Sequence, residues 1–123
     1  MKVLVVDDNK EITDMLALYF ETQGIDFAAI NDGEQGLEPI RNENTDLVLL
    51  DLAMPKFSGV DVVDYLMKEN LLDSKNIIIF TASSVSPQLF DDLINRGIKG
   101  ILKKPVDMNE LENLITRFRP KAN

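Results

Sequence analysis

The chain has 123 residues, and its content of 45% hydrophobic and 28% charged residues is typical of one folded globular domain. It contains no cysteine and no histidine, which excludes disulfides, thiolate or imidazole catalysis and most zinc sites. Thirteen basic against 21 acidic residues give a net charge of -8. This charge disfavours binding to nucleic acids or anionic membranes and favours cations and basic protein partners.

The N-terminal apolar run Lys2–Val6 is too short for a signal peptide. No segment approaches the roughly 18 apolar residues of a membrane span. We therefore expect a soluble, cytoplasmic protein without a membrane segment.

Short apolar segments alternate with amphipathic segments along the chain. Most of the apolar segments are continuously apolar and do not alternate with polar residues, as expected for strands that helices cover on both faces of a parallel sheet. The sequence predicts strands at Lys2–Val6, Phe27–Ile30, Leu47–Leu50, Ile77–Phe80 and Gly100–Leu102.

Helices are expected after these strands, because apolar residues recur there at helical spacing. Asn9, Ser86 and Asp107 stand where helix N-caps are expected. The apolar helix positions are Ile12, Met15, Leu16 and Tyr19, then Val60, Val63 and Met67, then Phe90, Leu93 and Ile94, and finally Leu111, Leu114, Ile115 and Phe118.

The segment of residues 33–43 also has a helical pattern, but Pro39 lies in its middle. Proline removes a backbone hydrogen bond and crowds the preceding turn. Either this helix is kinked at Pro39, or it begins near that residue.

The alternation of strands and helices predicts a single α/β domain, in which ligands bind outside the carboxyl ends of the strands. The second strand is followed by Asn31-Asp32-Gly33, which indicates no particular chemistry. The other strands are followed by residues with reactive or charged side chains: Asp7 and Asp8, Asp51, Thr81, and Lys103-Lys104-Pro105.

Three carboxylates at one sheet edge repel each other, and a bound divalent cation relieves that repulsion. A site with only oxygen ligands selects a hard cation, Mg²⁺ first. Thr81 adds a hydroxyl, and a lysine of the Lys103-Lys104 pair adds a fixed positive charge. Together these groups can cradle a phosphoryl group, and an aspartate at the centre can accept it covalently.

The motifs that carry this chemistry resemble those of the two-component response-regulator receiver domain, the stand-alone chemotaxis or phosphorelay type included. They are VVDDN at the first strand end, DLAMPKFSG around Asp51, FTA at Thr81 and KKP at Lys104. The resemblance runs from about Lys2 to Phe118. It implies a single doubly wound (βα)5 domain over residues 1–123, with a parallel five-stranded sheet in the flavodoxin-like order 2-1-3-4-5 and no effector domain.

The resemblance also implies roles for individual residues. Asp51 corresponds to the phosphoacceptor and, with Asp8, to a direct Mg²⁺ ligand. Asp7 corresponds to a ligand that acts through water, and the backbone carbonyl of Ala53 to a further ligand. Mn²⁺ is expected to fit the same site.

Thr81 resembles the switch hydroxyl, and Lys104 resembles the lysine that pairs with the phosphoryl group. The bond from Lys104 to Pro105 is usually cis in this family, as an X-Pro bond permits. Family members often have an aromatic switch residue three positions before the lysine. Here that switch position holds Ile101, so a smaller shift is expected to pass the signal.

The resemblance implies a signalling protein that catalyses only its own phosphorylation and dephosphorylation. Because the chain has no histidine, a histidine kinase or a histidine phosphotransfer protein must supply the phosphohistidine. No DNA-binding segment follows Phe118, so the expected effector is a separate protein. Lys99 and Gly100 replace residues that are often acidic in dimerising receivers, which favours a monomer.

Three other functions compete with this interpretation. A haloacid-dehalogenase-type phosphatase needs an acid two residues after its nucleophile, where this chain has Ala53. A flavodoxin-type module needs a phosphate loop rich in hydroxyls and amides, whereas Asp7 and Asp8 repel phosphate. The third alternative is a receiver-like docking module that works without phosphorylation.

Overall fold

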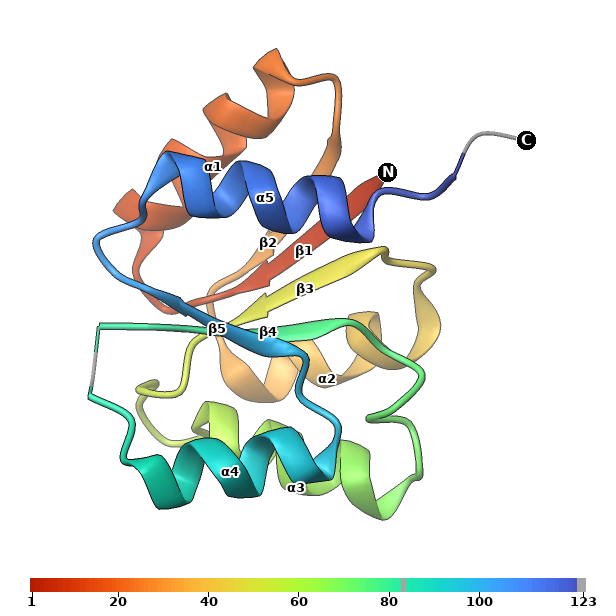
Figure 1. Ribbon diagram of the computed structural model, residues 1–123, viewed down its shortest axis with the longest axis vertical. Helices are drawn as coiled ribbons and strands as arrows, with labels where there is room; N and C mark the ends of the chain where they lie inside the picture. Colours follow the sequence, from red (N-terminus) through yellow and green to blue (C-terminus); the bar gives the residue numbers. More distant parts are fainter. Residues whose placement is uncertain (83, 122–123) are drawn as a thin grey trace.

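The computed structural model describes residues 1–82 and 84–121. Strands and helices alternate throughout this part of the chain (Figure 1). The strands are β1 (Lys2–Val6), β2 (Asp26–Ile30), β3 (Leu47–Leu50), β4 (Ile77–Thr81) and β5 (Gly100–Lys103). The helices are α1 (Lys10–Thr22), α2 (Gly33–Asn42), α3 (Gly59–Lys68), α4 (Pro87–Arg96) and α5 (Met108–Phe118).

The described strands pair in parallel in the order β2-β1-β3-β4-β5, which confirms the predicted sheet. Strand β1 lies between β2 and β3, while β2 and β5 are the outermost strands of the sheet. This order places the carboxyl ends of β1 and β3 side by side.

Two hydrophobic cores lie on the two faces of the sheet, because successive side chains of a strand point to opposite faces. Val3 and Val5 of β1 pack on the side of α1 and α5, and Leu4 and Val6 pack on the other side. Figure 1 shows α1 and α5 on one face and α2, α3 and α4 on the opposite face. Helix coverage on both faces explains why the strands are apolar without alternation.

Three strands are one residue longer than predicted. Strand β2 begins at Asp26, which pairs with Lys2, while β4 and β5 end at the paired residues Thr81 and Lys103. Backbone pairing with a neighbouring strand therefore extends the strands into polar residues, which an apolar pattern does not indicate.

Helix α2 begins at Gly33 and continues through Pro39, so the alternative of a start near Pro39 is wrong. The N-cap Asp32 accepts a hydrogen bond from Gln35 N–H, which fixes the first turn. Leu37 and Ile40 are buried against the sheet. Cap and core contacts thus offset the hydrogen bond that proline cannot donate.

The predicted caps of the other helices are confirmed. The side chains of Asn9, Ser86 and Asp107 accept hydrogen bonds from the first turns of α1, α4 and α5. Helix α3 starts with a capping box between Ser58 and Asp61, which the apolar pattern alone did not locate.

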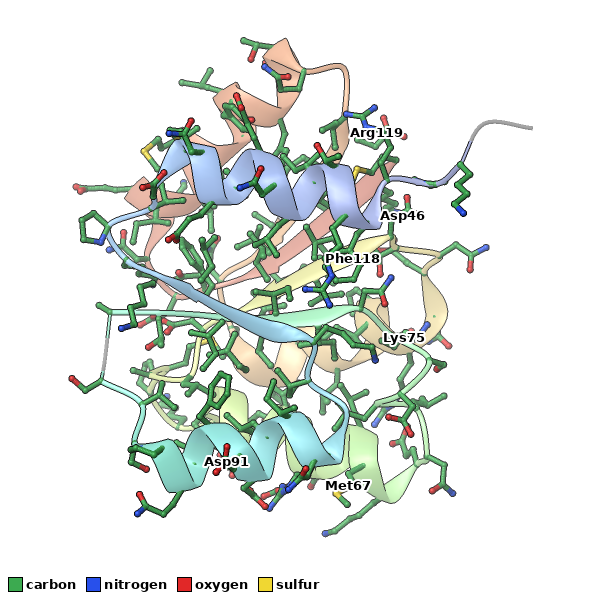
Figure 2. All side chains as sticks on the ribbon, in the orientation of Figure 1. Asp46, Met67, Lys75, Asp91, Phe118 and Arg119 are labelled. Atoms are coloured by element: carbon green, nitrogen blue, oxygen red, sulfur yellow. The ribbon has the colours of Figure 1, made fainter. Side chains whose placement is uncertain are left out.

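No helix in the described residues is both long and apolar enough to cross a membrane. Figure 2 shows Asp46 and Lys75 at the edge of the sheet where β3 and β4 begin, away from the carboxyl ends of the strands. We call this side, where the strands begin, the amino edge of the sheet, and the side where they end the carboxyl edge.

Candidate functional site

Three acidic side chains meet at the carboxyl edge of the sheet. Asp7 and Asp8 follow β1, and Asp51 follows the neighbouring strand β3. One carboxylate oxygen from each residue lies within 4.8 Å of the others. Asp7 and Asp51 are 0% and 4% exposed, whereas Asp8 faces the solvent. The structure thus brings together the acids that the sequence singled out.

Backbone hydrogen bonds hold the two buried acids in place. Asp7 N–H donates to Ile30 O at 3.0 Å, and Asp51 N–H donates to Val6 O at 2.9 Å. Both bonds continue the pairing between strands past their assigned ends. The backbones of both residues are therefore held by the sheet, and their carboxylates project from hydrogen-bonded strand ends.

Each buried carboxylate also accepts a hydrogen bond from the turn that follows it. Asp7 Oδ1 accepts from Asn9 N–H at 2.9 Å, and Asp51 Oδ1 accepts from Ala53 N–H at 3.2 Å. These local bonds orient each carboxylate so that its second oxygen faces the shared site.

Lys104 supplies the positive charge of the site. Its Nζ lies 2.6 Å from Asp7 Oδ2 and 3.5 Å from Asp51 Oδ2. The ammonium also lies 4.8 Å from the centre of the Phe80 ring, a cation–π contact. Lys104 N–H donates to Thr81 O at 3.0 Å, and the Lys104–Pro105 bond is cis, as the resemblance implied.

Negative charge exceeds positive charge in this cluster. Burial raises the pKa of Asp51, and the Asp7 carboxylate raises it further, while the Ala53 N–H and Lys104 lower it. Asp7 Oδ2 and Asp51 Oδ2 both face the ammonium of Lys104, and the third carboxylate, of Asp8, lies beside them. Three carboxylates with one ammonium leave a surplus of negative charge that fits a hard divalent cation.

Thr81 ends β4, between the strands that carry Asp51 and Lys104, and it is 1% exposed. Thr81 therefore lies at the same edge of the sheet as the acids. Lys103 is exposed and lines a groove between α4, β5 and α5, away from this cluster. Lys104, and not Lys103, is therefore the lysine of the site.

The start of α3 approaches the backbone of Asp51 and Leu52 closely. A Cβ added at Gly59 would lie 2.2 Å from Asp51 O and 2.8 Å from Leu52 Cα. Only glycine allows the start of α3 to pack this tightly against the loop. Ala53 is exposed two residues beyond Asp51.

Asn31 contacts the site, although the sequence indicated no chemistry for the end of β2. Its Nδ2 donates to Asp7 O at 2.8 Å and to Thr13 Oγ1 at 3.1 Å. The predicted adjacency of β2 and β1 is the signal that could have found this residue, because it places both strand ends next to each other.

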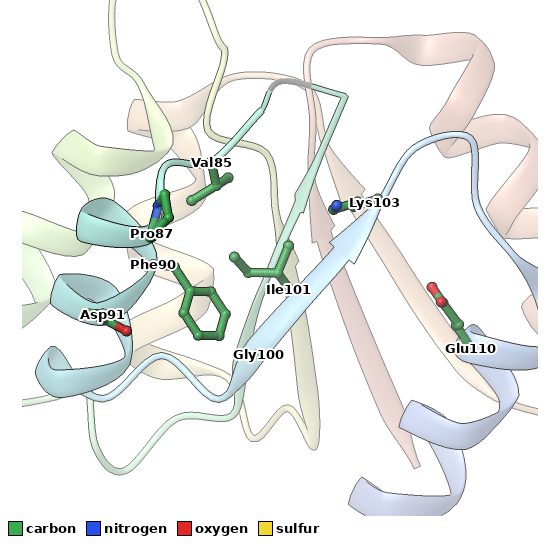
Figure 3. A pocket seen from close by; sticks show the side chains of 8 residues that line it. All are labelled: Val85, Pro87, Phe90, Asp91, Gly100, Ile101, Lys103 and Glu110. Carbon is green, nitrogen blue, oxygen red and sulfur yellow. The ribbon is translucent and has the colours of Figure 1, made fainter.

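The predicted switch position, Ile101, lies on β5 beside a groove of about 730 Å³. Figure 3 shows its side chain between Phe90 of α4 and Lys103 of β5, with Glu110 of α5 on the far side. Ile101 is partly buried and Phe90 is 40% exposed. An aromatic residue at position 101 would fill more of this groove than isoleucine does.

Comparison with known proteins adds independent evidence. A model of the response regulator receiver domain family matches residues 3–116. The chain is 33% identical over 118 residues to the CAI-1 autoinducer sensor kinase/phosphatase CqsS of Vibrio cholerae, covering 95% of this chain and 17% of that protein. It is 34% identical over 110 residues to the DNA-binding response regulator MtrA of Mycobacterium tuberculosis, covering 89% of this chain and 46% of that protein. The chain thus spans less than half the length of these two relatives.

Solved structures show the same fold. The receiver domain of the Francisella response regulator 1452 matches with a TM-score of 0.82 and 31% identity, covering 95% of this chain and 94% of that chain. The response regulator TrrA of Thermotoga maritima, solved in complex with Mg²⁺ and BeF, matches with a TM-score of 0.78 and 28% identity, covering 95% and 97%.

These matches, the strand order and the acidic cluster agree with each other. The chain therefore belongs to the response regulator receiver domain family of two-component signalling proteins.

Proposed function

We propose that this protein accepts a phosphoryl group on Asp51 and passes the signal to another protein by a change of conformation. Receiver domains take phosphoryl groups from histidine kinases or phosphotransfer proteins and bind Mg²⁺ at an acidic pocket. The observation that carries the proposal for this chain is the cluster of three carboxylates, two of them buried, with the ammonium of Lys104 as their counter-charge.

Asp7, Asp8, Asp51 and the Ala53 carbonyl are the proposed ligands of Mg²⁺, and Mn²⁺ fits the same oxygen set. The bound cation supplies positive charge that neutralises the carboxylates and the phosphoryl oxygens. The surplus of negative charge at this edge explains why such a cation is needed.

In the proposed transfer, an Asp51 carboxylate oxygen attacks the phosphorus of a phosphohistidine. A P–O bond forms, the P–N bond breaks, and the imidazole nitrogen keeps the electron pair of the broken bond. Lys104 neutralises charge on the arriving phosphoryl oxygens, and Thr81 donates its hydroxyl to one of them. Hydrolysis of the same acyl phosphate returns Asp51 to its starting state, so the protein catalyses only its own phosphorylation and dephosphorylation.

The proposed output passes from Thr81 through the β4–β5 pair. Thr81 pairs with Lys103, two residues beyond Ile101, so a shift of Thr81 reaches the groove between α4, β5 and α5 (Figure 3). We propose that a separate effector protein docks there when Asp51 is phosphorylated. Complete conversion from 1:99 to 99:1 between two states requires about 5.5 kcal/mol of differential stabilisation.

The proposed state of the protein is a monomer that acts in the cytoplasm. The Nζ of Lys99, directly before β5, donates to the backbone carbonyls of Asp73, Lys75 and Gly97. Because these hydrogen bonds use the Lys99 ammonium within the chain, we do not expect Lys99 to form ion pairs with a second copy of the chain. Light scattering after size-exclusion chromatography, with and without phosphorylation, tests the monomeric state.

The site assignment is tested by incubation with acetyl phosphate and Mg²⁺, followed by intact mass measurement and peptide mapping. We expect one added phosphoryl group on Asp51 and none in Asp51→Asn. Asp46→Asn, an acid at the amino edge, serves as the matched control and should label like the wild type. Equal labelling of Asp51→Asn contradicts the site, and no labelling of the wild type favours the docking module that works without phosphorylation.

A further inference from the structure

Asn31 links three elements at the candidate site. It directly follows β2, and its Nδ2 donates to Asp7 O and to Thr13 Oγ1 of α1 at 2.8 and 3.1 Å. Thr13 is 2% exposed, and its Oγ1 donates onward to Lys10 O at 3.1 Å. A primary amide has two N–H groups, and these two acceptors use both of them.

The carbonyl that Asn31 holds belongs to the peptide group that joins Asp7 to Asp8. The orientation of this peptide sets the direction in which the chain leaves β1, and therefore where the Asp8 carboxylate lies. Within the described residues, no hydrogen bond or ion pair holds the Asp8 side chain itself. The position of Asp8 thus depends on its backbone.

We infer that Asn31 is a positioning residue for the metal ligands Asp7 and Asp8, with Thr13 as the anchor that orients the Asn31 amide. The inference rests on the proposed function, because it assumes that these acids bind a cation. Groups that orient metal ligands contribute to affinity by reducing the ordering that binding requires.

The chemistry of the network requires an amide at position 31. An aspartate offers no N–H to the Asp7 carbonyl, and an alanine leaves both acceptors without this donor. The hydroxyl of Thr13 accepts from Asn31 and donates to Lys10 O, which valine cannot do. Serine keeps the hydroxyl and should preserve the network.

A matched control exists at the other edge of the sheet. Asn76 Nδ2 donates to Asp46 O at 3.0 Å, so it also holds a backbone carbonyl at one end of a strand, here directly before β3. Asn76→Ala removes an equivalent amide-to-carbonyl bond far from the acids. A purely structural role of Asn31 would make the two alanine variants behave alike.

The experiment is an isothermal titration of the metal-free protein with MgCl₂, at a temperature at which urea unfolding curves show every variant folded. We expect Asn31→Ala to weaken the Mg²⁺ affinity about tenfold. This is the lower end of the range for loss of a residue that hydrogen-bonds to a metal ligand. Asn76→Ala should keep the wild-type affinity. Thr13→Val should weaken the affinity less than Asn31→Ala, and Thr13→Ser should restore it.

Equal Mg²⁺ affinities of Asn31→Ala, Asn76→Ala and the wild type overturn the inference and leave the proposed function standing. A wild type that binds no Mg²⁺ overturns the proposed function and the inference together. If Asn31→Ala fails to fold, the pair Thr13→Val and Thr13→Ser decides: equal affinities for these two variants overturn the inference.

Discussion

The two edges of the parallel sheet carry charged groups that are arranged in opposite ways. At the amino edge, charges and polar groups have partners within the chain. Asp46 Oδ2 accepts from Lys2 N–H at 2.7 Å, and Lys2 Nζ lies 3.3 Å from Glu43 Oε1. Lys75 Nζ donates to Arg41 O at 3.3 Å (Figure 2 shows Asp46 and Lys75).

At the carboxyl edge, the two buried carboxylates of Asp7 and Asp51 share the ammonium of Lys104, and the carboxylate of Asp8 lies beside them with no ion pair among the described residues. The buried carboxylates at the carboxyl edge lower the free energy of unfolding, whereas the paired charges at the amino edge do not. The difference indicates that the amino edge serves stability, whereas the carboxyl edge is built for an ion and a phosphoryl group that the chain itself does not provide.

The largest predicted change in stability comes from Lys104→Met. Asp7 is 0% exposed, so removal of the ammonium leaves a buried carboxylate without its counter-charge. We expect a loss of about 3–5 kcal/mol of unfolding free energy in metal-free buffer, measured by urea denaturation. MgCl₂ should reduce this loss, because the cation replaces the missing positive charge.

Lys2→Met is the control at the amino edge. The side chains of the Lys2–Glu43 ion pair are 34% and 43% exposed, so solvent screens their attraction. This variant should lose less than about 1 kcal/mol. A loss in Lys104→Met no larger than in Lys2→Met would contradict the contrast between the edges.

Gly59→Ala tests how tightly the site is packed. Its Cβ would lie 2.2 Å from Asp51 O, so the Asp51 loop or the start of α3 must move, and we expect a cost of about 2–3 kcal/mol. Gly24 at the other end of the molecule has a φ of +66° and no atom within 4 Å of an added Cβ. Gly24→Ala should therefore cost only the backbone strain of about 1 kcal/mol. Comparable costs in thermal unfolding would refute the tight packing at the site.

Asp51→Asn should stabilise the metal-free protein at neutral pH by about 1 kcal/mol. Asparagine keeps an oxygen for the Ala53 N–H but removes a charge that burial and Asp7 disfavour. Asp46→Asn should have the opposite sign, with a loss of up to about 1 kcal/mol, because its charged hydrogen bond to Lys2 N–H becomes neutral. Destabilisation by Asp51→Asn in urea unfolding would contradict the crowded acidic cluster.

A smaller effect concerns pH. Because the pKa of Asp51 is raised above its ordinary value of 3.8, the folded state binds this proton more tightly than the unfolded state. The stability contributed by protonated Asp51 is present below pH 3.8 and is lost as the pH rises through the folded-state pKa. The advantage of Asp51→Asn over the wild type should therefore shrink as the pH falls from 7 toward 4. An advantage that is constant over this range would argue against the raised pKa.

The sequence located the strands and the candidate site residues because both depend on local signals, whereas the order of the strands was implied by the family resemblance. Continuous apolar runs located the strands, and polar residues at their ends marked Asp7, Asp8, Asp51, Thr81 and Lys104. The sequence pattern does not decide the path of α2 through Pro39, because this path depends on the burial of Leu37 and Ile40 and not on helix propensity.

Long-range contacts were not visible in the sequence. The pairing of Lys104 with Asp7 joins residues at opposite ends of the chain, and the contact of Asn31 with Asp7 depends on the register of β2 and β1. Neither residue's own neighbours in the sequence indicate its partner. The complete burial of the Asp7 carboxylate likewise emerges only from the packed structure.

The unfolding temperature of the wild-type protein with and without MgCl₂ tests the central claim most directly. Binding to the folded state alone raises stability by about 2.7 kcal/mol when the free cation is a hundred times its dissociation constant. We predict a higher midpoint in MgCl₂ than in NaCl of the same ionic strength, a gain that Asp46→Asn keeps and Asp8→Asn loses. Identical midpoints in the two salts would show that the carboxyl edge needs no cation and would contradict the account.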